Sequence, residues 1–360
     1  MLRILYISPE NTVGVLGYWR RAHTLNGHYC RYVTFFRSAG DFEEDICLEL
    51  PLVAARPWFL RSRIFFARYV ERRNPWRDIG GNPPWWRPPV WQQLLFRMRE
   101  ALWLPRIQQA IRRHRLADFD VYHFEWGTDF FRDARFAAHL KRKGKKIICH
   151  YHGQDMRNRG VIPAMDALSD LNLTNELDLM YRHPNIRYLF LPYDVQAHSL
   201  KTETGRPLTL CHATTNRLVK GSDHIIAVCR ELEQSHGVRF LFIENQPHQK
   251  VLELKRQADI YIDQITDHAW GYGMNSLEAL AMGIPCVTYL NSTYTRFIPD
   301  HPFISADGGN LRERLVELIE QPELIRQIGT ASRRWVEKYH DYRNVVTHLY
   351  EYYRTIGLRV

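Results

Sequence analysis

The residues with the clearest chemical potential are one carboxylate and two cations in the C-terminal half of the chain. Glu278 follows a glycine-rich stretch, Trp270-Gly-Tyr-Gly-Met-Asn-Ser-Leu, and stands just inside a predicted helix. Arg217 and Lys220 precede Gly221, where another helix is expected to begin. Free N–H groups at a helix start attract phosphate, and glycine lets a ligand approach the backbone. Arg and Lys can balance phosphate charge while a carboxylate accepts sugar hydroxyls, so the pattern predicts a ligand that carries both groups.

A second group of polar residues lies in the N-terminal half. The turn His152-Gly-Gln-Asp155-Met-Arg157 follows a predicted strand. Histidine can hold a charge or move a proton near neutral pH, and Asp155 and Arg157 could orient it or bind an acceptor. A structural histidine at a strand end is the alternative for His152. Gly14, in the loop 11–17 after the first predicted strand, is a weaker candidate for the same side of a site.

The elements that must position these residues alternate between strand and helix. Strands are predicted over 3–8, 28–36, 121–125, 145–151, 186–191, 208–212, 238–244, 258–263 and 285–289. Helices are predicted over 19–25, 90–115 with an interruption at Pro105, 131–143, 222–235, 249–257, 311–320, 323–339 and 342–356. This alternation predicts two doubly wound α/β halves, with a boundary in the polar stretch 192–206.

The positive charge of the chain is concentrated in one segment. The 49 Lys and Arg against 39 Asp and Glu give a net charge of +10. Between Arg56 and Arg115 there are fourteen arginines and three acidic residues, and 14 − 3 = +11 accounts for the whole excess. Six of the ten tryptophans lie there too. Arg with Trp suits a membrane interface, while a solvated face over an aromatic core is the alternative. We expect no nucleic-acid partner because no nucleic-acid-binding motif accompanies the charge.

Composition sets further limits. With 360 residues, 45% of them hydrophobic, the sequence suits a globular protein of about two domains. No apolar run reaches the roughly 18 residues of a membrane-spanning helix, and the start is too short for a signal peptide. The six cysteines show no CxxC spacing, so we expect buried free thiols in a reducing compartment and no zinc site. We therefore expect a cytoplasmic protein, with a peripheral position on the inner face of the membrane if the arginine-rich segment binds lipid.

The Trp270–Pro285 stretch and the Arg217–Gly221 turn together resemble the nucleotide-sugar donor site of retaining GT-B glycosyltransferases of the family 4, or group 1, type. The resemblance implies two Rossmann-like domains facing each other across a cleft. Residues 1–200 would form the acceptor-side domain with a basic insertion at about 40–115. Residues 206–338 would form the donor domain, and a helix in 339–360 would cross back to the first domain.

The resemblance also implies roles for individual residues. Arg217 and Lys220 would stabilise the departing diphosphate, and Glu278 would bind the ribose hydroxyls. His152 would approach the donor sugar and act in catalysis, while Gly14 would meet the diphosphate or the acceptor. The sugar or the β-phosphate would meet the backbone of the five residues Gly271, Tyr272, Gly273, Met274 and Asn275.

The sequence departs from the family pattern at one position. Trp270 stands where relatives carry the first Glu of their EX7E motif, which touches the donor sugar. Asp267, His268 or Tyr272 could supply that contact instead. The pattern therefore indicates the class of enzyme and leaves the identity of the sugar open.

The activity that the resemblance implies is transfer of a sugar from a UDP-, GDP- or TDP-linked donor to a glycan or lipid-linked acceptor. It implies a retaining outcome, no metal and no required cofactor, in cell-envelope or polysaccharide biosynthesis. One alternative keeps the fold and changes the reaction to that of a nucleotide-sugar epimerase or a phosphorylase. A second is a non-catalytic GT-B scaffold that binds a membrane or a polyanion.

Overall fold

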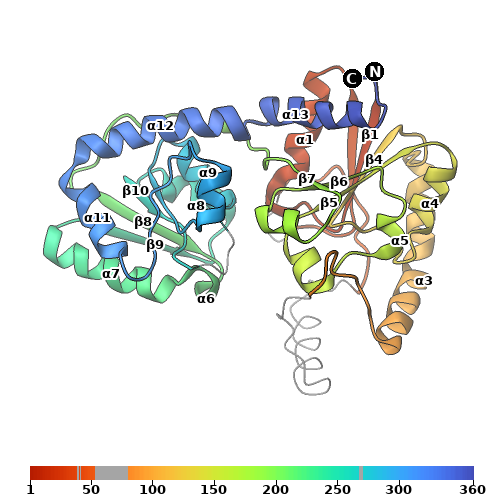
Figure 1. The fold of residues 1–360 in the computed structure, drawn as a ribbon, viewed down its shortest axis with the longest axis horizontal. Coiled ribbons are helices and arrows are strands. Elements are labelled where there is room, and N and C mark those ends of the chain that lie inside the picture. The colour runs from red at the N-terminus through yellow and green to blue at the C-terminus, as the bar shows by residue number, and fades with distance from the viewer. Residues whose placement is uncertain (39, 41, 53–79, 267–270) are drawn as a thin grey trace. The chain divides into compact units, whose positions relative to one another are not determined.

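A computed structural model describes residues 1–38, 40, 42–52, 80–266 and 271–360 (Figure 1). The chain divides into two compact units. Unit 1 comprises Met1–Leu191 and Val346–Val360, and unit 2 comprises Pro192–Val345. The predicted roles of the two parts, acceptor side and donor side, stay predictions.

Unit 1 is built on a seven-stranded parallel sheet. Its strands are β1 (Arg3–Ser8), β2 (Tyr29–Thr34), β3 (Ile46–Cys47), β4 (Val121–Glu125), β5 (Lys146–Tyr151), β6 (Leu171–Thr174) and β7 (Ile186–Tyr188). Their order is β3-β2-β1-β4-β5-β6-β7. The direction of winding reverses between β1 and β4, which makes the carboxyl edge at these strands the expected place for a ligand.

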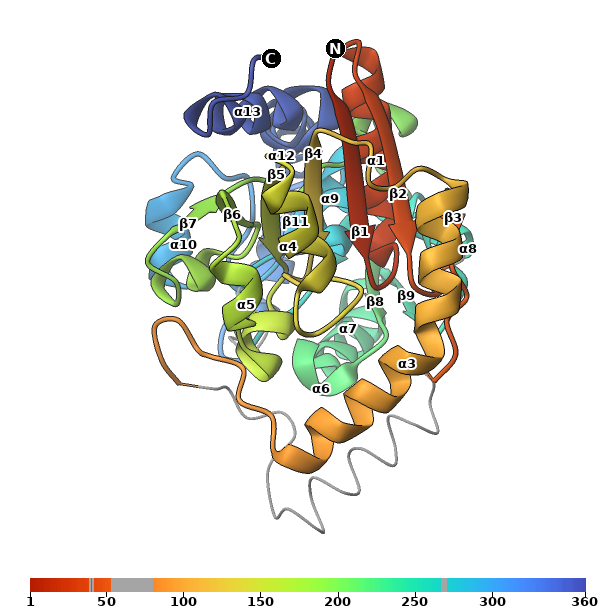
Figure 2. The ribbon, with the colours of Figure 1, turned by 90° about the vertical axis from the view of Figure 1, so that its right-hand side faces the viewer.

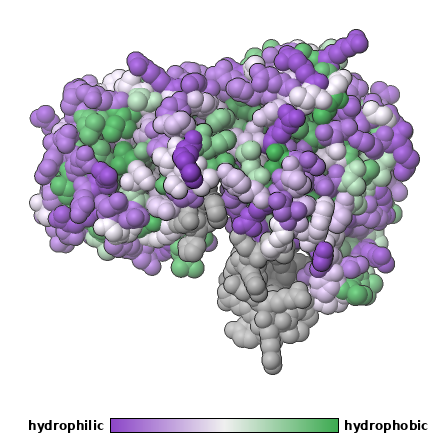
Figure 3. All heavy atoms as spheres, in the orientation of Figure 1, coloured by the Kyte–Doolittle hydropathy of each residue, from purple (hydrophilic) through white to green (hydrophobic). Residues whose placement is uncertain are grey.

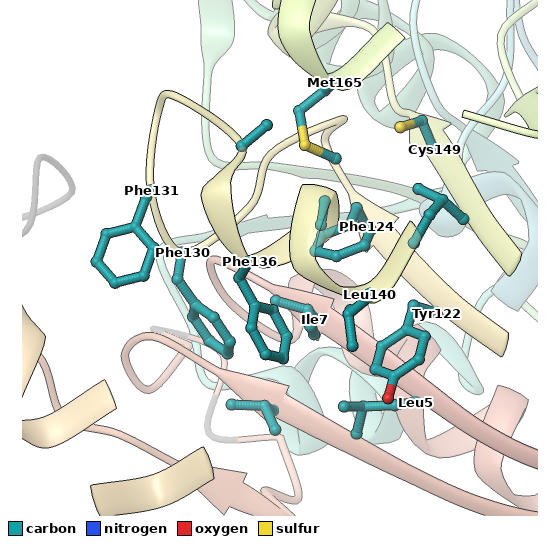
Figure 4. Packing of buried hydrophobic residues seen from close by; sticks show 14 of the residues in the cluster. Leu5, Ile7, Tyr122, Phe124, Phe130, Phe131, Phe136, Leu140, Cys149 and Met165 are labelled. Atoms are coloured by element: carbon teal, nitrogen blue, oxygen red, sulfur yellow. The ribbon is translucent and has the colours of Figure 1, made fainter. Parts of the chain in front are cut away.

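Helices cover this sheet and complete the hydrophobic core of unit 1. They are α1 (Val15–Leu25), α3 (Val90–Arg113), α4 (Arg135–Arg142), the short α5 (Pro163–Asp166) and α13 (Tyr342–Thr355). Phe136 and Leu140 of α4 point toward Ile7 of β1 and Tyr122 of β4 (Figure 4). The sequence predicts α4 from 131, but Phe130 and Phe131 precede the helix and are buried in the core. The Asp129 carboxylate accepts hydrogen bonds from the backbone N–H groups of residues 136 and 137, which fixes the later start.

The predicted interruption of α3 at Pro105 is wrong, because the helix runs unbroken from Val90 to Arg113. Proline inside a helix removes one hydrogen bond and costs about 3 kcal/mol. Trp103 and Ile107 lie on either side of the proline and are buried in the unit 1 core. Their burial offsets that cost. Figure 2 shows the first turns of α3 extending past the lower end of the unit 1 sheet.

Unit 2 contains a second, four-stranded parallel sheet. Its strands are β8 (Thr209–Thr214), β9 (Arg239–Glu244), β10 (Ile260–Ile262) and β11 (Cys286–Val287), in the order β11-β10-β8-β9. Its helices are α6 (Arg217–Lys220), α7 (Ser222–His236), α8 (His248–Lys255), α9 (Met274–Ala281), α10 (Ser292–Phe297), α11 (Leu311–Glu320) and α12 (Pro322–His340). Here the winding reverses between β8 and β10. The two parallel sheets with flanking helices confirm the predicted α/β class.

The C-terminal helix α13 contributes two tyrosines to unit 1. Tyr353 lies 2.6 Å from the imidazole of His123, and Tyr350 lies 2.9 Å from His23. Burial lowers the pKa of His123 to about 3, so its ring is neutral. These contacts give His123 a structural role.

Two predictions from composition can also be compared with the structure. All six cysteines are free thiols, and five of them are buried, as predicted. Among the described residues, none of the helices combines the length and hydropathy that a membrane crossing requires.

Candidate functional site

Lys220 is held at the carboxyl edge of the unit 2 sheet, beside the reversal between β8 and β10. Its ammonium donates to Asp263 Oδ1 at 2.5 Å and to the Ala213 carbonyl at 3.1 Å. Ser276, on α9, donates to the other Asp263 oxygen at 2.5 Å. Burial raises the pKa of Asp263, but the charge of Lys220 and these hydrogen bonds bring it below its usual range. These two bonds fix the position of the Lys220 cation. An ammonium has three N–H donors, so Lys220 has one donor beyond these two bonds.

The turn after Lys220 requires glycine. Gly221 has φ +70°, and a Cβ added there would lie 2.8 Å from Ile265 and 3.0 Å from Thr266. The next residue, Ser222, begins α7, and its hydroxyl lies 2.8 Å from the buried His212. The Lys-Gly pair therefore marks a turn that packs directly against the segment after β10.

Arg217 stands at the exposed start of α6 with its guanidinium already paired. Nε and a terminal nitrogen donate to the two carboxylate oxygens of Glu244 at 2.6 and 2.7 Å. Glu244 ends β9, and the guanidinium lies 5.1 Å from the centre of the Phe242 ring. The Arg217 side chain is 45% exposed. A diphosphate would have to replace Glu244 as its partner, so the predicted phosphate role of Arg217 stays a prediction.

Glu278 lies in the second turn of α9 and is buried. Lys255 Nζ lies 2.5 Å from one carboxylate oxygen and His248 Nε2 lies 2.7 Å from the other. Burial raises the pKa of Glu278, but the charge of Lys255 and the hydrogen bonds from both partners lower it to about 2. Lys255 also donates to Asn275 Oδ1 at 2.9 Å. Glu278 is therefore a permanent carboxylate whose position is fixed.

The glycine-rich loop before α9 is fixed by Gln264, which donates to the carbonyls of Gly271 and Tyr289 at 3.0 and 2.9 Å. Tyr272 turns into unit 2, where its hydroxyl lies 3.0 Å from His340 and its ring packs on aromatic side chains. Gly273 is exposed and precedes α9, which has no side-chain cap. The first amides of α9 are thus the part of this loop that is suited to an anion.

Three predicted sugar-side residues, Asp267, His268 and Trp270, lie outside the described residues. Of the remaining loop residues, Met274 and Asn275 begin α9 and are partly exposed. Asn275 is held by Lys255, so its side-chain oxygen is engaged within the unit. The donor-binding roles of the loop stay predictions.

In unit 1, His152 is held between two hydrogen-bond acceptors. Its Nδ1 lies 2.8 Å from Asn175 Oδ1, and its Nε2 contacts the Glu125 carboxylate. Two acceptors require a proton on each ring nitrogen, which is the imidazolium form. Burial lowers the pKa of His152, but the charge and hydrogen bond of Glu125 raise it to about 9. His152 is therefore a cation at neutral pH and a poor general base.

The register of the sheet explains why Glu125 meets His152. Glu125 ends β4 and pairs directly with His150 on β5, so both side chains and that of His152 lie on one face of the sheet. Burial and the charge of His152 lower the pKa of His150 well below its usual range. Glu125 Oε1 and His150 Nε2 are buried and have no partner among the described residues. Glu125, His150 and His152 each offer one ligand atom, and these atoms lie within 4.8 Å of one another. Among the described residues, this is the group that could hold a metal ion. The prediction that the site needs no metal stays a prediction.

Asp155 and Arg157 hold the turn that follows His152. The Asp155 carboxylate accepts the backbone N–H of His152 at 2.9 Å and that of Met156 at 2.7 Å. Arg157 is buried and donates to Asp178 at 2.8 Å and to Glu176 at 2.7 Å. The contacts give both residues a positioning role, and their predicted part in acceptor binding stays a prediction.

Gly14 precedes α1 at the carboxyl edge of β1. It has φ +76°, and a Cβ there would lie 2.8 Å from the Phe42 ring. Close packing and the left-handed backbone both explain this glycine. Its predicted contact with a diphosphate or an acceptor stays a prediction.

Sequence reasoning missed four residues that set the state of the candidate site: Glu125, His248, Lys255 and Asp263. Two signals could have found them. His248 and Lys255 are seven residues apart, two helical turns, and so share one face of α8, which begins one residue before the predicted helix 249–257. Glu125 and Asp263 each end a predicted strand, where the carboxyl edge of a parallel sheet gathers polar side chains.

Comparison with known proteins adds the family of the C-terminal part. Residues 222–351 match the family model described as Glycosyl transferase-like. This range begins with α7 and contains Glu278. The match confirms the prediction that this part of the chain is of glycosyltransferase type. A search of curated proteins gave no match.

Solved structures share the fold of the whole chain. Sucrose-phosphate synthase from Thermosynechococcus elongatus is 11% identical with a TM-score of 0.62, over 98% of this chain and 99% of that one. Anabaena HepE, solved with UDP-glucose, is 11% identical with a TM-score of 0.57, over 99% and 100%. A putative UDP-N-acetylglucosamine 2-epimerase from Listeria monocytogenes is 10% identical with a TM-score of 0.53, over 97% and 95%. At these identities the likeness shows the fold, and it confirms the predicted GT-B architecture.

Proposed function

Because residues 222–351 are of glycosyltransferase type, we propose that the protein transfers a sugar from a nucleotide-diphosphate donor to a glycan or lipid-linked acceptor. We place the reaction in cell-envelope or polysaccharide biosynthesis, in the cytoplasm at the inner face of the membrane. The donor is a UDP-, GDP- or TDP-sugar. The likeness to HepE, which was solved with UDP-glucose, makes UDP the first nucleotide to test.

One observation carries the donor assignment: α9 links the hydrogen-bonded group around Lys220 to the one around Glu278. Ser276 and Glu278 are both on α9, and Ser276 reaches Lys220 through Asp263. Helix α9 therefore brings together a fixed cation, a fixed carboxylate and its own uncapped start. A nucleoside diphosphate presents phosphate oxygens and ribose hydroxyls, which are the groups that these three features accept.

The chemistry follows from where charge develops. The bond between the sugar and the β-phosphate breaks, and its electron pair leaves with the diphosphate. Lys220, Arg217 and the first amides of α9 would stabilise that charge without a metal. We propose a retaining, front-face transfer in which the acceptor hydroxyl attacks and its proton passes to the departing phosphate. The fixed positive charge of His152 would act on the sugar side as an electrostatic group.

The test compares two Lys–Asp pairs of the same unit. Lys220→Ala removes the proposed phosphate ligand, whereas Lys201→Ala removes a cation that lies 2.9 Å from Asp259, just before β10. We expect Lys220→Ala to lower transfer from the best donor of a nucleotide-sugar panel by about 10²–10³-fold, and Lys201→Ala to leave transfer within about threefold. Full transfer and full donor affinity in Lys220→Ala would overturn the donor site.

The fold alone does not separate transfer from epimerisation, since the Listeria neighbour is a putative epimerase. An epimerase would convert the donor sugar with no acceptor present, and a phosphorylase would need inorganic phosphate. Product analysis with and without acceptor and phosphate distinguishes these reactions from transfer. A non-catalytic scaffold would show no stabilisation by any nucleotide sugar in a thermal-shift assay while keeping lipid or polyanion binding.

A further inference from the structure

The described part of the arginine-rich segment contains α3, a helix with two different faces. Its inner face is buried against unit 1 through Glu100, Trp103, Ile107 and Ala110. The Trp103 indole also donates to the Pro51 carbonyl at 2.6 Å. These contacts fix which side of the helix faces outward.

The outward face carries a row of large apolar side chains. Thirteen large hydrophobic residues of the described chain are exposed, and five of them are on α3. They are Val90 (81% exposed), Leu94 (59%), Leu95 (50%), Met98 (59%) and Leu102 (58%). Four of the five recur every fourth residue, which places them in one stripe about 18 Å long. Figure 3 shows hydrophobic spheres at the lower right, where Figure 1 places the first turns of α3.

The charged side chains on the outward face of α3 are all positive. The exposed cations on and beside α3 are Arg87, Arg97, Arg106, Arg112, Arg113 and Arg115. Glu100 is the only acidic residue of the helix, and it is turned inward, where it accepts the backbone N–H of Arg132 at 2.8 Å. The outward face of α3 therefore combines apolar side chains with cations and has no carboxylate.

This combination selects the partner. Apolar side chains gain free energy on leaving water, while arginines gain it beside phosphate, and the headgroup region of an anionic bilayer offers both. A nucleic acid would match the arginines and leave the leucines against its phosphates. We propose that the outward face of α3 docks on a bilayer of anionic phospholipids, with Leu94, Met98 and Leu102 at the acyl boundary and Arg97 and Arg106 at the phosphates.

The outward face of α3 is the proposed docking face. This proposal rests on the proposed function and assigns its membrane location to one surface of the protein. The binding test needs no sugar transfer, so a failed docking face leaves the donor site standing, and a failed donor site leaves the docking face standing.

The experiment is co-sedimentation of the full chain with phosphatidylcholine vesicles, with and without about one third phosphatidylglycerol. We expect wild-type protein to bind the anionic vesicles at least about tenfold more tightly than the neutral ones. Leu94→Ser/Met98→Ser/Leu102→Ser should lose about tenfold in binding to the anionic vesicles. Arg97→Gln/Arg106→Gln should lose about tenfold as well and should show a weaker dependence on salt.

A matched control is Leu25→Ser/Tyr181→Ser, which removes two exposed apolar side chains elsewhere in unit 1, 65% and 67% exposed. It should bind the anionic vesicles as wild type does. Equal vesicle binding by the triple serine variant and wild type would overturn the proposal, as would wild-type binding that ignores lipid charge. A wild-type oligomer that the triple serine variant dissociates in ultracentrifugation, without vesicles, would reassign the face to contact between copies of the chain.

Discussion

The buried ion pair between Lys255 and Glu278 allows a sharp test of the site. Lys255→Met keeps an unbranched side chain at a position with no exposed surface and removes the cation. Glu278 then keeps His248 as its hydrogen-bond partner. Breaking a buried ion pair by removing one member costs about 3–5 kcal/mol, because the other charge stays in the interior.

The pKa of Glu278 gives an independent magnitude. Burial alone would raise this pKa, and Lys255 and His248 instead lower it from 4.5 to about 2. A difference of that size is worth about 3 kcal/mol of stability. Because the pKa in the folded state is depressed, this contribution is complete above pH 4.5 and disappears as the pH falls through 2. We expect Lys255→Met to lose most of this acid dependence along with the stability.

Hydrogen exchange of the α8 and α9 amides measures the loss within unit 2. Lys255→Met should lower the free energy of local opening by about 3 kcal/mol or more at pH 7, and Lys255→Met/Glu278→Gln should recover at least half of that loss. Lys201→Met, which breaks the pair with Asp259, should cost less because Lys201 is partly exposed. Wild-type exchange in Lys255→Met, or losses that simply add in the double variant, would refute the reasoning.

Three further changes test other parts of the two units. Glu125→Gln should lower the pKa of His152 from about 9 toward 6.5, observed by NMR titration of the imidazole, whereas an unchanged titration would contradict the ion pair. Because that pKa is raised, the pair stabilises unit 1 fully below pH 6.5, and wild-type protein should lose this contribution as the pH rises through 9. Gly221→Ala and Gly237→Ala both place a side chain at positive φ, but the Cβ at Gly237 meets nothing within 4 Å. Urea unfolding should therefore show that Gly221→Ala lowers the free energy of unfolding by about 1 kcal/mol or more beyond the loss in Gly237→Ala. Glu244→Gln weakens the pair that holds the Arg217 guanidinium and leaves it Asp223 at 3.4 Å, and calorimetry should show UDP binding up to about fivefold tighter; equal or weaker binding would argue against a phosphate role for that guanidinium.

The local pattern of the sequence predicts most elements of the fold and misses those that depend on distant packing. Strong alternation defines β8 and β9 to within two residues of the observed ends. β6 escapes prediction because it is four residues long and contains Asn172, whose amide donates to Asp166 at 3.0 Å. At Pro105 the local pattern wrongly predicts an interruption of the helix. The cost of the proline is offset by the burial of neighbouring side chains, and the sequence pattern does not show that burial.

The candidate site divides in the same way. The residue types at 217, 220 and 278 indicate the ligand class, because phosphate and ribose need cations and a carboxylate. The state of each group depends on a partner far along the chain: Lys255 is 23 residues from Glu278, and Asp263 is 43 residues from Lys220. The sequence pattern can place these partners on a helix face and at a strand end, but which charge each of them meets depends on strand order and helix packing.

Arg217 and Lys220 illustrate what this difference means for function. They look equivalent in the sequence, but the partner of Lys220 is the buried Asp263, whereas Glu244 pairs with Arg217 at the surface. Water screens an exposed pair, so a doubly charged ligand can displace Glu244 at small cost. The buried pair resists exchange because separation would leave a carboxylate uncompensated in the interior. We therefore expect Lys220 to be preorganised in the absence of ligand, and Arg217 to change partners when a diphosphate binds.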